Sequence, residues 1–300
     1  MTSTTVTIAG MGPADVSANM IPEPRDEAVL AGAVDWLDAA NKLSIARGRV
    51  TSVLDMDSVA NGATEGDAQS WKVVSATTTV MTPGLKIAFI LLTTARMRST
   101  PANLEAVATG ILQRAAMNEL DSDICTAGSA GWTETGGDSA AALSLAKMVE
   151  GAALYRGSLK SGSTVGLFVL DDGAFADLEQ ESLTSQSTIL NMGDRSLVDI
   201  FSMPPRSTSS AMRGKISNFP ILITGNVVES ASVKKNFLFR PAMNDAIGGG
   251  IGGAWDYLED KAQIDSQRGN RIAGKSASLE GRWSVAVQNP DAGVLLESAA

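Results

Sequence analysis

Apolar side chains recur every three or four residues between Thr100 and Ile124, the spacing typical of an amphipathic helix. Thr100 can cap the first turn, and Pro101 suits the first helical position. We predict a helix of about 24 residues, about 36 Å long at about 1.5 Å per residue. Ile111 is expected to help hold it onto a sheet, as one member of a stripe made of Leu104, Val107, Ala108, Ile111, Leu112, Ala115 and Leu120.

A helix, a buried strand and a second helix are predicted in close succession after that long helix. Residues 139–159 have helical spacing, residues 164–170 form the short apolar run TVGLFVL, and residues 174–183 are helical again. Asp171 and Asp172 stand where they would cap the last of these segments. The order indicates an α/β unit.

Two strand-like runs, residues 71–80 and 85–93, flank Pro83 and Gly84. Proline followed by glycine suits the centre of a type II turn, so we predict that the two runs pair as a long β-hairpin. The first run is rich in threonine and poor in large apolar residues. Such a hairpin is marginally stable alone and is expected to rest on another subunit.

Weaker patterns cover the rest of the chain. Glu27 to Ala46 has helical spacing with Asp26 as its cap, and residues 254–274 fit either a strand or a helix. Strands are predicted at 198–203, 219–228 and 234–241, with two more within 278–298 on either side of an Asn-Pro-Asp-Ala-Gly turn. Residues 1–25 form a polar arm with too little apolar surface to fold alone.

Composition removes several classes of function. The chain has 300 residues, 44% of them hydrophobic, which is enough for a substantial core in one or two domains. Its formal net charge of −9 argues against wrapping around nucleic acid. Cys125 is the sole cysteine and histidine is absent, so disulfides, Cys/His zinc sites, Ser-His-Asp triads and Cys-His dyads are excluded.

The stretch GGGIGG, residues 248–253, formally matches the dinucleotide-binding fingerprint. That fingerprint needs a strand before it, a helix after it and an acidic residue about 20 positions further on. Asp265 comes too early for this role and Glu280 too late. We therefore predict no nucleotide site, and expect a mobile glycine loop at an exposed edge or a subunit contact.

Other candidate chemistry is explained better by structure. Three pairs of acidic residues lack further metal ligands at useful spacing, and we expect structural roles for them: Asp55 and Asp57, Asp121 and Asp123, Asp171 and Asp172. Cys125 is expected to be a small buried hydrophobe. A basic cluster of Lys234, Lys235 and Arg240 is interpreted as a solvated strand edge, with contact to packaged nucleic acid as the alternative. The chain is therefore expected to have no catalytic, cofactor-binding or metal-binding residues.

The order of the elements resembles the major capsid protein of tailed phages, which has the Hong Kong 97 fold. The likeness lies in residues 87–124, where a strand runs into the long helix, in the helix-strand-helix unit at 141–181, and in the closing strands at 279–298. It covers nearly the whole chain and is one of architecture rather than of single motifs. It implies an α+β fold with an N-terminal arm, an extended β-hairpin loop, a peripheral domain with a long spine helix, and an axial α/β domain.

The resemblance also implies a division of the chain. The N-terminal arm and short helix would take residues 1–50, and the extended hairpin loop residues 51–95. The peripheral domain would combine residues 96–138 and 271–300, and the axial domain would take residues 139–270. Because no charged helical leader precedes the arm, a separate scaffolding protein or a cleaved precursor is expected.

The implied function is a non-enzymatic subunit that self-assembles into hexamers and pentamers of an icosahedral shell around double-stranded DNA. Expected partners are further copies of the chain, packaged DNA at the inner surface, and scaffolding, portal and decoration proteins, with no membrane and no cofactor. The location would be the virion capsid, after assembly in the host cytoplasm. Two alternatives remain: an α/β enzyme using carboxylates or the glycine-rich stretch, and another virion component such as a tail protein. Some relatives crosslink a hairpin lysine to an asparagine, and Lys72 and Asn289 occupy broadly suitable regions without a matching motif.

Overall fold

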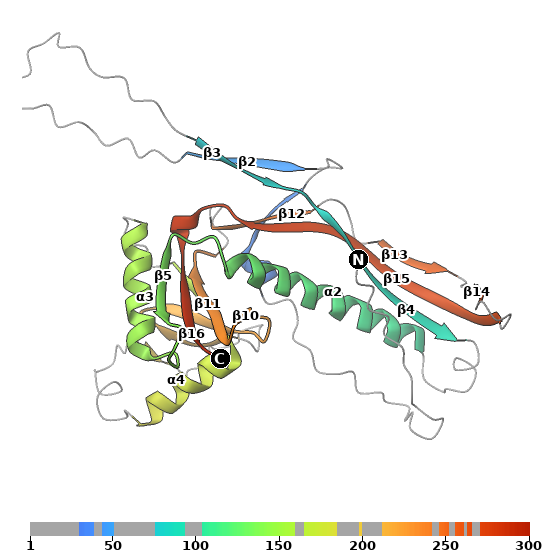
Figure 1. The fold of residues 1–300 in the computed structure, drawn as a ribbon. Helices are drawn as coiled ribbons and strands as arrows, with labels where there is room; N and C mark the ends of the chain where they lie inside the picture. The colour runs from blue at the N-terminus through green and yellow to red at the C-terminus, as the bar shows by residue number, and fades with distance from the viewer. Residues whose placement is uncertain are drawn as a thin grey trace, which may run out of the picture.

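The computed structural model describes residues 30–38, 44–50, 76–93, 104–159, 165–184, 198–199, 212–241, 246–251, 256–260, 263–265 and 271–300. These residues form a mixed α+β fold with one compact end and one long extension (Figure 1). An eight-stranded sheet and two helices make the compact end. A six-stranded sheet and the longest helix make the extension.

The eight-stranded sheet is built from segments far apart in the chain. Its order is β5 (Glu134–Asp138), β16 (Gly293–Ala299), β11 (Val233–Phe239), β6 (Leu167–Leu170), β9 (Phe219–Ile223), β8 (Met212–Ile216) and β7 (Val198–Asp199), and β10 (Glu229–Ser230) also pairs with β11. β6 pairs with β9 in parallel and with β11 in antiparallel orientation. All four residues of β6 are buried because Phe168 and Leu170 point into one hydrophobic core and Leu167 and Val169 into the other.

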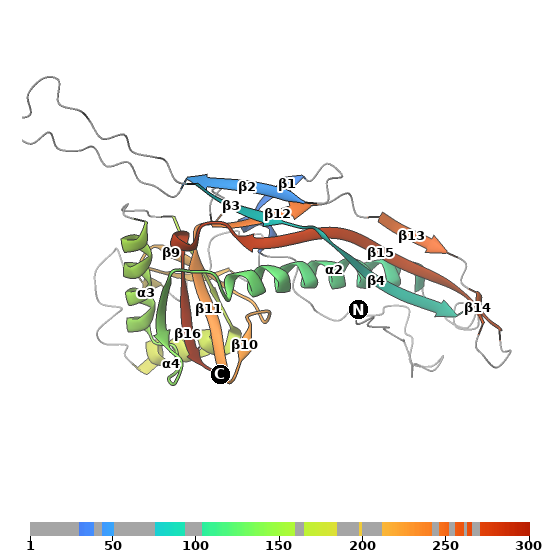
Figure 2. The same cartoon turned by 45° about the horizontal axis from the view of Figure 1, so that its top comes forward.

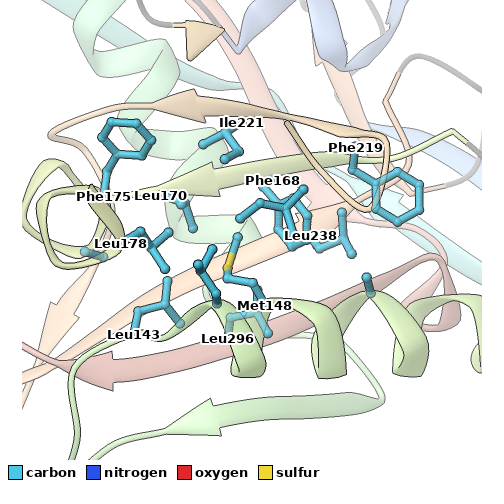
Figure 3. Close-up of a cluster of buried hydrophobic side chains, with 14 of the residues drawn as sticks. Leu143, Met148, Phe168, Leu170, Phe175, Leu178, Phe219, Ile221, Leu238 and Leu296 are labelled. Carbon is cyan, nitrogen blue, oxygen red and sulfur yellow. The ribbon is translucent and has the colours of Figure 1, made fainter. Parts of the chain in front are cut away.

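The main hydrophobic core lies between this sheet and helices α3 (Leu145–Ser158) and α4 (Asp172–Thr184). Met148 of α3, Phe168 of β6 and Leu178 of α4 point toward one another there (Figure 3). The predicted helix-strand-helix unit is therefore confirmed. The Ser144 hydroxyl caps α3 by accepting from the Lys147 N–H. The Asp171 carboxylate accepts from the Gly173 N–H at the start of α4, which confirms the predicted cap at Asp171.

The six-stranded sheet is organised around β15 (Arg271–Val287), a strand of 17 residues. β4 (Gly84–Thr93) pairs along one edge of β15. Three shorter strands pair along its other edge: β12 (Ile247–Ile251), β13 (Asp256–Asp260) and β14 (Gln263–Asp265). β1 (Asp35–Asp38) pairs in parallel with β12. The ends of β4 and β15 with β13 form the extension away from the compact end (Figure 2).

Helix α2 (Leu104–Gly128) confirms the predicted long helix and lies along one face of the six-stranded sheet (Figures 1 and 2). Leu112 and Ala116 are buried against Ile90 of β4 and Leu279 of β15, whereas Ile111 is only half-buried beside them. Leu112 and Ile111 both contact the sheet side as the stripe predicted, and Leu112 is the more deeply buried of the two. A Cβ at Gly110 would meet nothing within 4 Å, so close packing does not explain that glycine.

A second core joins the two sheets. The C-terminal half of α2 contributes Ile124 and Cys125, which pack with Leu30, Phe237 and Ile247. Leu30 precedes η1 (Ala31–Ala33), and its backbone N–H donates to the buried Asp121 carboxylate over 3.1 Å. The chain also links the sheets directly, because β15 leads through η2 (Pro290–Ala292) into β16.

The predicted hairpin between residues 71–80 and 85–93 is wrong in its pairing. β3 (Ala76–Met81) pairs with β2 (Ile45–Val50) as a two-stranded antiparallel ribbon, and β4 pairs with β15. We call residues 45–50 and 76–81 the β2–β3 ribbon. The two strands flanking Pro83 do exist, but the edge of β15 provides β4 with ten cross-strand partners, more than β3 could offer.

The predicted helix over Glu27–Ala46 is also wrong within the described residues. That segment contains η1, β1 and the beginning of β2. Apolar residues at Leu30, Val34 and Leu37 had suggested helical spacing, but tertiary pairing of β1 with β12 outweighs this weak local preference. The ambiguous segment at 254–274 contains strands β13 and β14 and the start of β15. Thr100, Pro101 and the arm at 1–25 lie outside the described residues.

Candidate assembly surfaces

Strand β4 has one face inside the molecule and one outside. Lys86, Ala88 and Ile90 turn toward α2, whereas Leu85, Ile87 and Phe89 turn away from it. The three outward side chains are 49%, 56% and 36% exposed. We call them the β4 stripe. Neighbouring exposed apolar side chains of this kind can serve as an interaction surface.

The surroundings of the β4 stripe are suited to contact with another protein. Register places Arg282, Glu280 and Ser278 of β15 opposite Leu85, Ile87 and Phe89, so an apolar row lies beside a polar one. Among the described strands, β4 pairs with β15 alone, which leaves its other edge without a strand partner. Edges of this kind can accept a further strand or side chains from another chain.

The inner face of β4 explains how the stripe is held in place. Lys86 Nζ contacts Glu119 Oε1 at 2.8 Å and Asp123 Oδ2 at 3.2 Å, both on α2. The ammonium also lies 5.9 Å from the centre of the Trp283 ring, whose Nε1–H donates to Asp123 over 2.8 Å. These carboxylates raise the pKa of Lys86, although desolvation acts against them and is the largest single influence. The network fixes the orientation of β4 on the helix.

The β2–β3 ribbon also has two unlike faces. Its outer face carries small or apolar exposed residues, namely Ala46, Gly48, Thr78 and Val80, with Val80 60% exposed. Its inner face places Met81, which is buried, above the six-stranded sheet. An outer face with small side chains allows another backbone to approach closely.

Two ion pairs hold the inner face of the ribbon to the rest of the subunit. Arg47 Nη1 lies 2.5 Å from Asp35 Oδ2 of β1, and Arg49 Nη2 lies 2.7 Å from Asp291 Oδ2 of η2. Thr133 Oγ1–H donates to the other oxygen of Asp291 over 2.8 Å. The hydrogen bond from Thr133, followed by that from Arg49, lowers the pKa of Asp291 below its ordinary value.

We expect the Asp291 contact to stabilise the subunit only where this carboxylate is charged. A pKa that is lower in the folded state adds stability above the unfolded value of about 3.9, and this contribution is lost as the pH falls through the folded pKa. Urea unfolding should therefore find wild type more stable than Asp291→Asn at pH 6, with the difference shrinking below about pH 4. In a Thr133→Val background, Asp291→Asn should cost less stability at pH 6 than it does in wild type. A gap that stays constant with pH would contradict the assignment.

The acidic pairs have structural roles where the structure describes them. Asp121 accepts from the Leu30 backbone, and Asp123 accepts from Trp283. Asp171 pairs with Lys234, so that member of the proposed basic cluster is not a free cation. Asp55 and Asp57 lie outside the described residues.

Two further candidate residues, Cys125 and Asn289, lie within the described part of the chain. Cys125 is fully buried, and desolvation raises the pKa of its thiol, which confirms the interpretation as a buried hydrophobe. Asn289 accepts the Asp291 N–H and caps η2, and Lys72 lies outside the described residues. Within the described ranges, no three Cys, Asp or Glu residues gather closely enough to hold a metal. No helix in this part of the chain is long and apolar enough to span a membrane.

The expectation of a mobile, exposed glycine loop is wrong for the first part of GGGIGG. Gly248, Gly249 and Gly250 are buried in β12, between β1 and β15. The strand pairs on both sides and does not open into a helix within the described residues, unlike a nucleotide-binding loop. Gly252 and Gly253 lie outside the described residues. A glycine-dense run can mark a loop, but close packing in a strand can also require glycine.

Sequence reasoning also missed strand β2, which completes the ribbon. The run Ile45-Ala46-Arg47-Gly48-Arg49-Val50 alternates between larger and smaller residues, and the structure puts Arg47 and Arg49 on the same face. That two-residue period was the available signal. Two arginines and a glycine in six residues obscured it, because these residues are not typical of strands.

Comparison with known proteins connects this architecture to solved structures. No family model matches the chain, and no curated protein matches it by sequence. The capsid chain of Ralstonia phage GP4 is 10% identical with a TM-score of 0.65, and the match covers 100% of this chain and 98% of that one. A chain of Mycobacterium phage Che8 is 13% identical with a TM-score of 0.65, covering 93% and 94%.

A cellular protein has a similar structure as well. The SrpI encapsulin of Synechococcus elongatus is 12% identical with a TM-score of 0.55, over 93% of this chain and 91% of that chain. At identities this low, the structural matches show the fold alone. They extend through nearly all of this chain and of each matched chain. The described α+β architecture, with its long helix and two sheets, is therefore the fold of these phage capsid chains.

Proposed function

We propose that this chain is the major capsid protein of a tailed phage. In this role, copies of the chain assemble into hexamers and pentamers of an icosahedral shell that encloses double-stranded DNA. The observation that carries the proposal is the β4 stripe, because a subunit of this fold leaves Leu85, Ile87 and Phe89 in water unless another chain covers them. The exposed outer face of the β2–β3 ribbon provides a second surface for contact between copies.

The proposed domains follow the fold. The N-terminal arm and the extended loop would be residues 1–50 and 51–95, with a peripheral domain around α2 and an axial domain around α3 and α4. The strand pairing favours two changes to the boundaries first drawn from the sequence. The axial domain would gain β16, which pairs in the eight-stranded sheet, and the peripheral domain would gain β12 and β13, which pair in the six-stranded sheet. The ribbon would belong to the extended loop, which then includes Ile45–Val50.

A structural role without catalysis is also part of the proposal. Packing, capping or ion pairing accounts for Asp121, Asp123, Asp171 and Cys125. Scaffolding, portal and decoration proteins would be further partners, and DNA would lie at the inner surface. The protein would be assembled in the host cytoplasm and would end in the virion.

Negative-stain microscopy of the purified protein, with size-exclusion chromatography, tests the proposal directly. We expect capsomers or closed shells in which many subunits meet, together with nuclease-resistant DNA in particles from producing cells. A small closed oligomer at every concentration would contradict assembly into a shell. Shells that never protect DNA would contradict the proposed enclosure of DNA.

A further inference from the structure

Three consecutive glycines, Gly248, Gly249 and Gly250, form the central part of β12, and we call them the glycine triplet. β12 lies between β1 and β15, so neighbouring backbone occupies both of its edges. Alternation along the strand makes Gly249 face the core beside Ile247, and makes Gly248 and Gly250 face the β2–β3 ribbon. Without side chains, both faces of the strand are open to close approach.

On the core face, Trp36 of β1 occupies the space above Gly249. Register pairs these two residues, and a Cβ added at Gly249 would lie 2.2 Å from Cε3 and Cζ3 of the indole ring. The ring is held in this orientation by its Nε1–H, which donates to the Ala31 carbonyl over 2.8 Å. Any side chain at position 249 must therefore displace the Trp36 ring from its place on β1.

On the opposite face, the base of the ribbon occupies the space above Gly250. A Cβ there would lie 3.1 Å from Ile45 Cδ1 and 3.6 Å from Met81 Cβ, one residue from each ribbon strand. Above Gly248, a Cβ would lie 1.7 Å from Gln288 Nε2, which itself is 3.9 Å from Met81 Sδ. The ribbon thus lies almost on the backbone of the sheet.

Both faces of β12 affect the position of the β2–β3 ribbon. β1 rests on the glycine triplet through Trp36, and Asp35 of β1 pairs with Arg47 of β2. The ribbon rests on the triplet directly through Ile45 and Met81. A side chain on either face of β12 would therefore raise or tilt the ribbon relative to the six-stranded sheet.

We propose that the glycine triplet positions the β2–β3 ribbon for contact with a second copy of this chain. The triplet sets the height and direction at which the ribbon leaves the subunit. The outer face of Ala46, Gly48, Thr78 and Val80 then meets the neighbouring copy at the angle that a closed shell requires. The inference rests on the proposed capsid function and adds the residues that control the geometry of assembly.

Two substitutions test the positioning role from opposite faces. Gly249→Ala displaces Trp36, and Gly250→Val pushes against Ile45 at the surface between ribbon and sheet. We expect both full-length variants to lose closed shells about tenfold, and trypsin to cleave after Arg47 and Arg49 about tenfold faster in the free subunit. Gly32→Ala is the matched control, since a Cβ at Gly32 meets nothing within 4 Å and should change neither readout.

A double variant separates positioning from a general loss of stability. Trp36→Leu removes the ring atoms that collide with the new methyl group, so Gly249→Ala combined with Trp36→Leu should be cleaved more slowly than Gly249→Ala alone. General destabilisation would instead make the double variant worse. Equal trypsin cleavage and equal shell yield in wild type, Gly249→Ala and Gly250→Val would overturn the inference. If wild type itself forms no shells, the capsid proposal fails, and the cleavage rates still decide whether the triplet positions the ribbon.

Discussion

Replacing Ile87 with lysine should give a folded subunit that no longer assembles. Ile87 is 56% exposed at the centre of the β4 stripe, and register places Glu280 of β15 opposite it. The new ammonium would face that carboxylate across the strands, which favours the fold. In a shell, the same charge would be buried against apolar surface of a neighbour, at a cost of several kcal/mol.

Size-exclusion chromatography and negative-stain microscopy measure this outcome, with circular dichroism to verify the fold. Ile87→Val is the matched control, because it keeps an apolar β-branched side chain at the same place and should still assemble. Normal shell yield from Ile87→Lys would mean that the stripe is not buried between subunits, and would remove the main support for the capsid proposal.

Replacing Phe219 with alanine should destabilise the compact end of the subunit by about 3–5 kcal/mol. Phe219 is fully buried in the main core (Figure 3). Its ring centre lies 5.5 Å from that of Tyr155 and 6.0 Å from that of Phe168, in edge-to-face arrangements. The Arg156 guanidinium lies 5.1 Å from the same ring. Alanine removes all three contacts and leaves a cavity between α3 and β9.

Denaturant unfolding of the free subunit measures this change. Phe89→Ala provides a matched control, because it removes the same side chain from the partly exposed β4 stripe and should cost about 1 kcal/mol or less. Similar losses for the two variants would contradict the central place of Phe219 in the core. In assembled particles, the stability losses caused by Phe219→Ala and Phe89→Ala should be more similar, because the proposed contact between copies also buries Phe89.

Local sequence pattern was sufficient where an element satisfies its own backbone hydrogen bonds or lies close to its partner in the chain. The long helix appears as α2, and the helix-strand-helix unit appears as α3, β6 and α4. The cap at Asp171 acts within a few residues of its own helix. Helical spacing and caps depend on neighbours three or four positions away, so the sequence itself contains this information.

Strand pairing was not available from the sequence in the same way. Residues 76–81 and 84–93 are strands, but their partners are Ile45–Val50 and a segment nearly 200 positions away in β15. The turn residues Pro83 and Gly84 favour a tight hairpin locally. The ten-residue register with β15 and the packing of Ile90 on Leu112 outweigh that preference, because a strand gains more from a long partner and a covered face.

The sequence by itself determined the long helix, the helix-strand-helix unit, and the lack of histidine or paired cysteine chemistry. The tertiary structure decided which strands share a sheet, which face of β4 stays in water, and why the glycines at 248–250 are needed. The physical reason is distance along the chain. Helical periods and caps act over a few residues, whereas the space above Gly249 is defined by Trp36, more than 200 positions earlier.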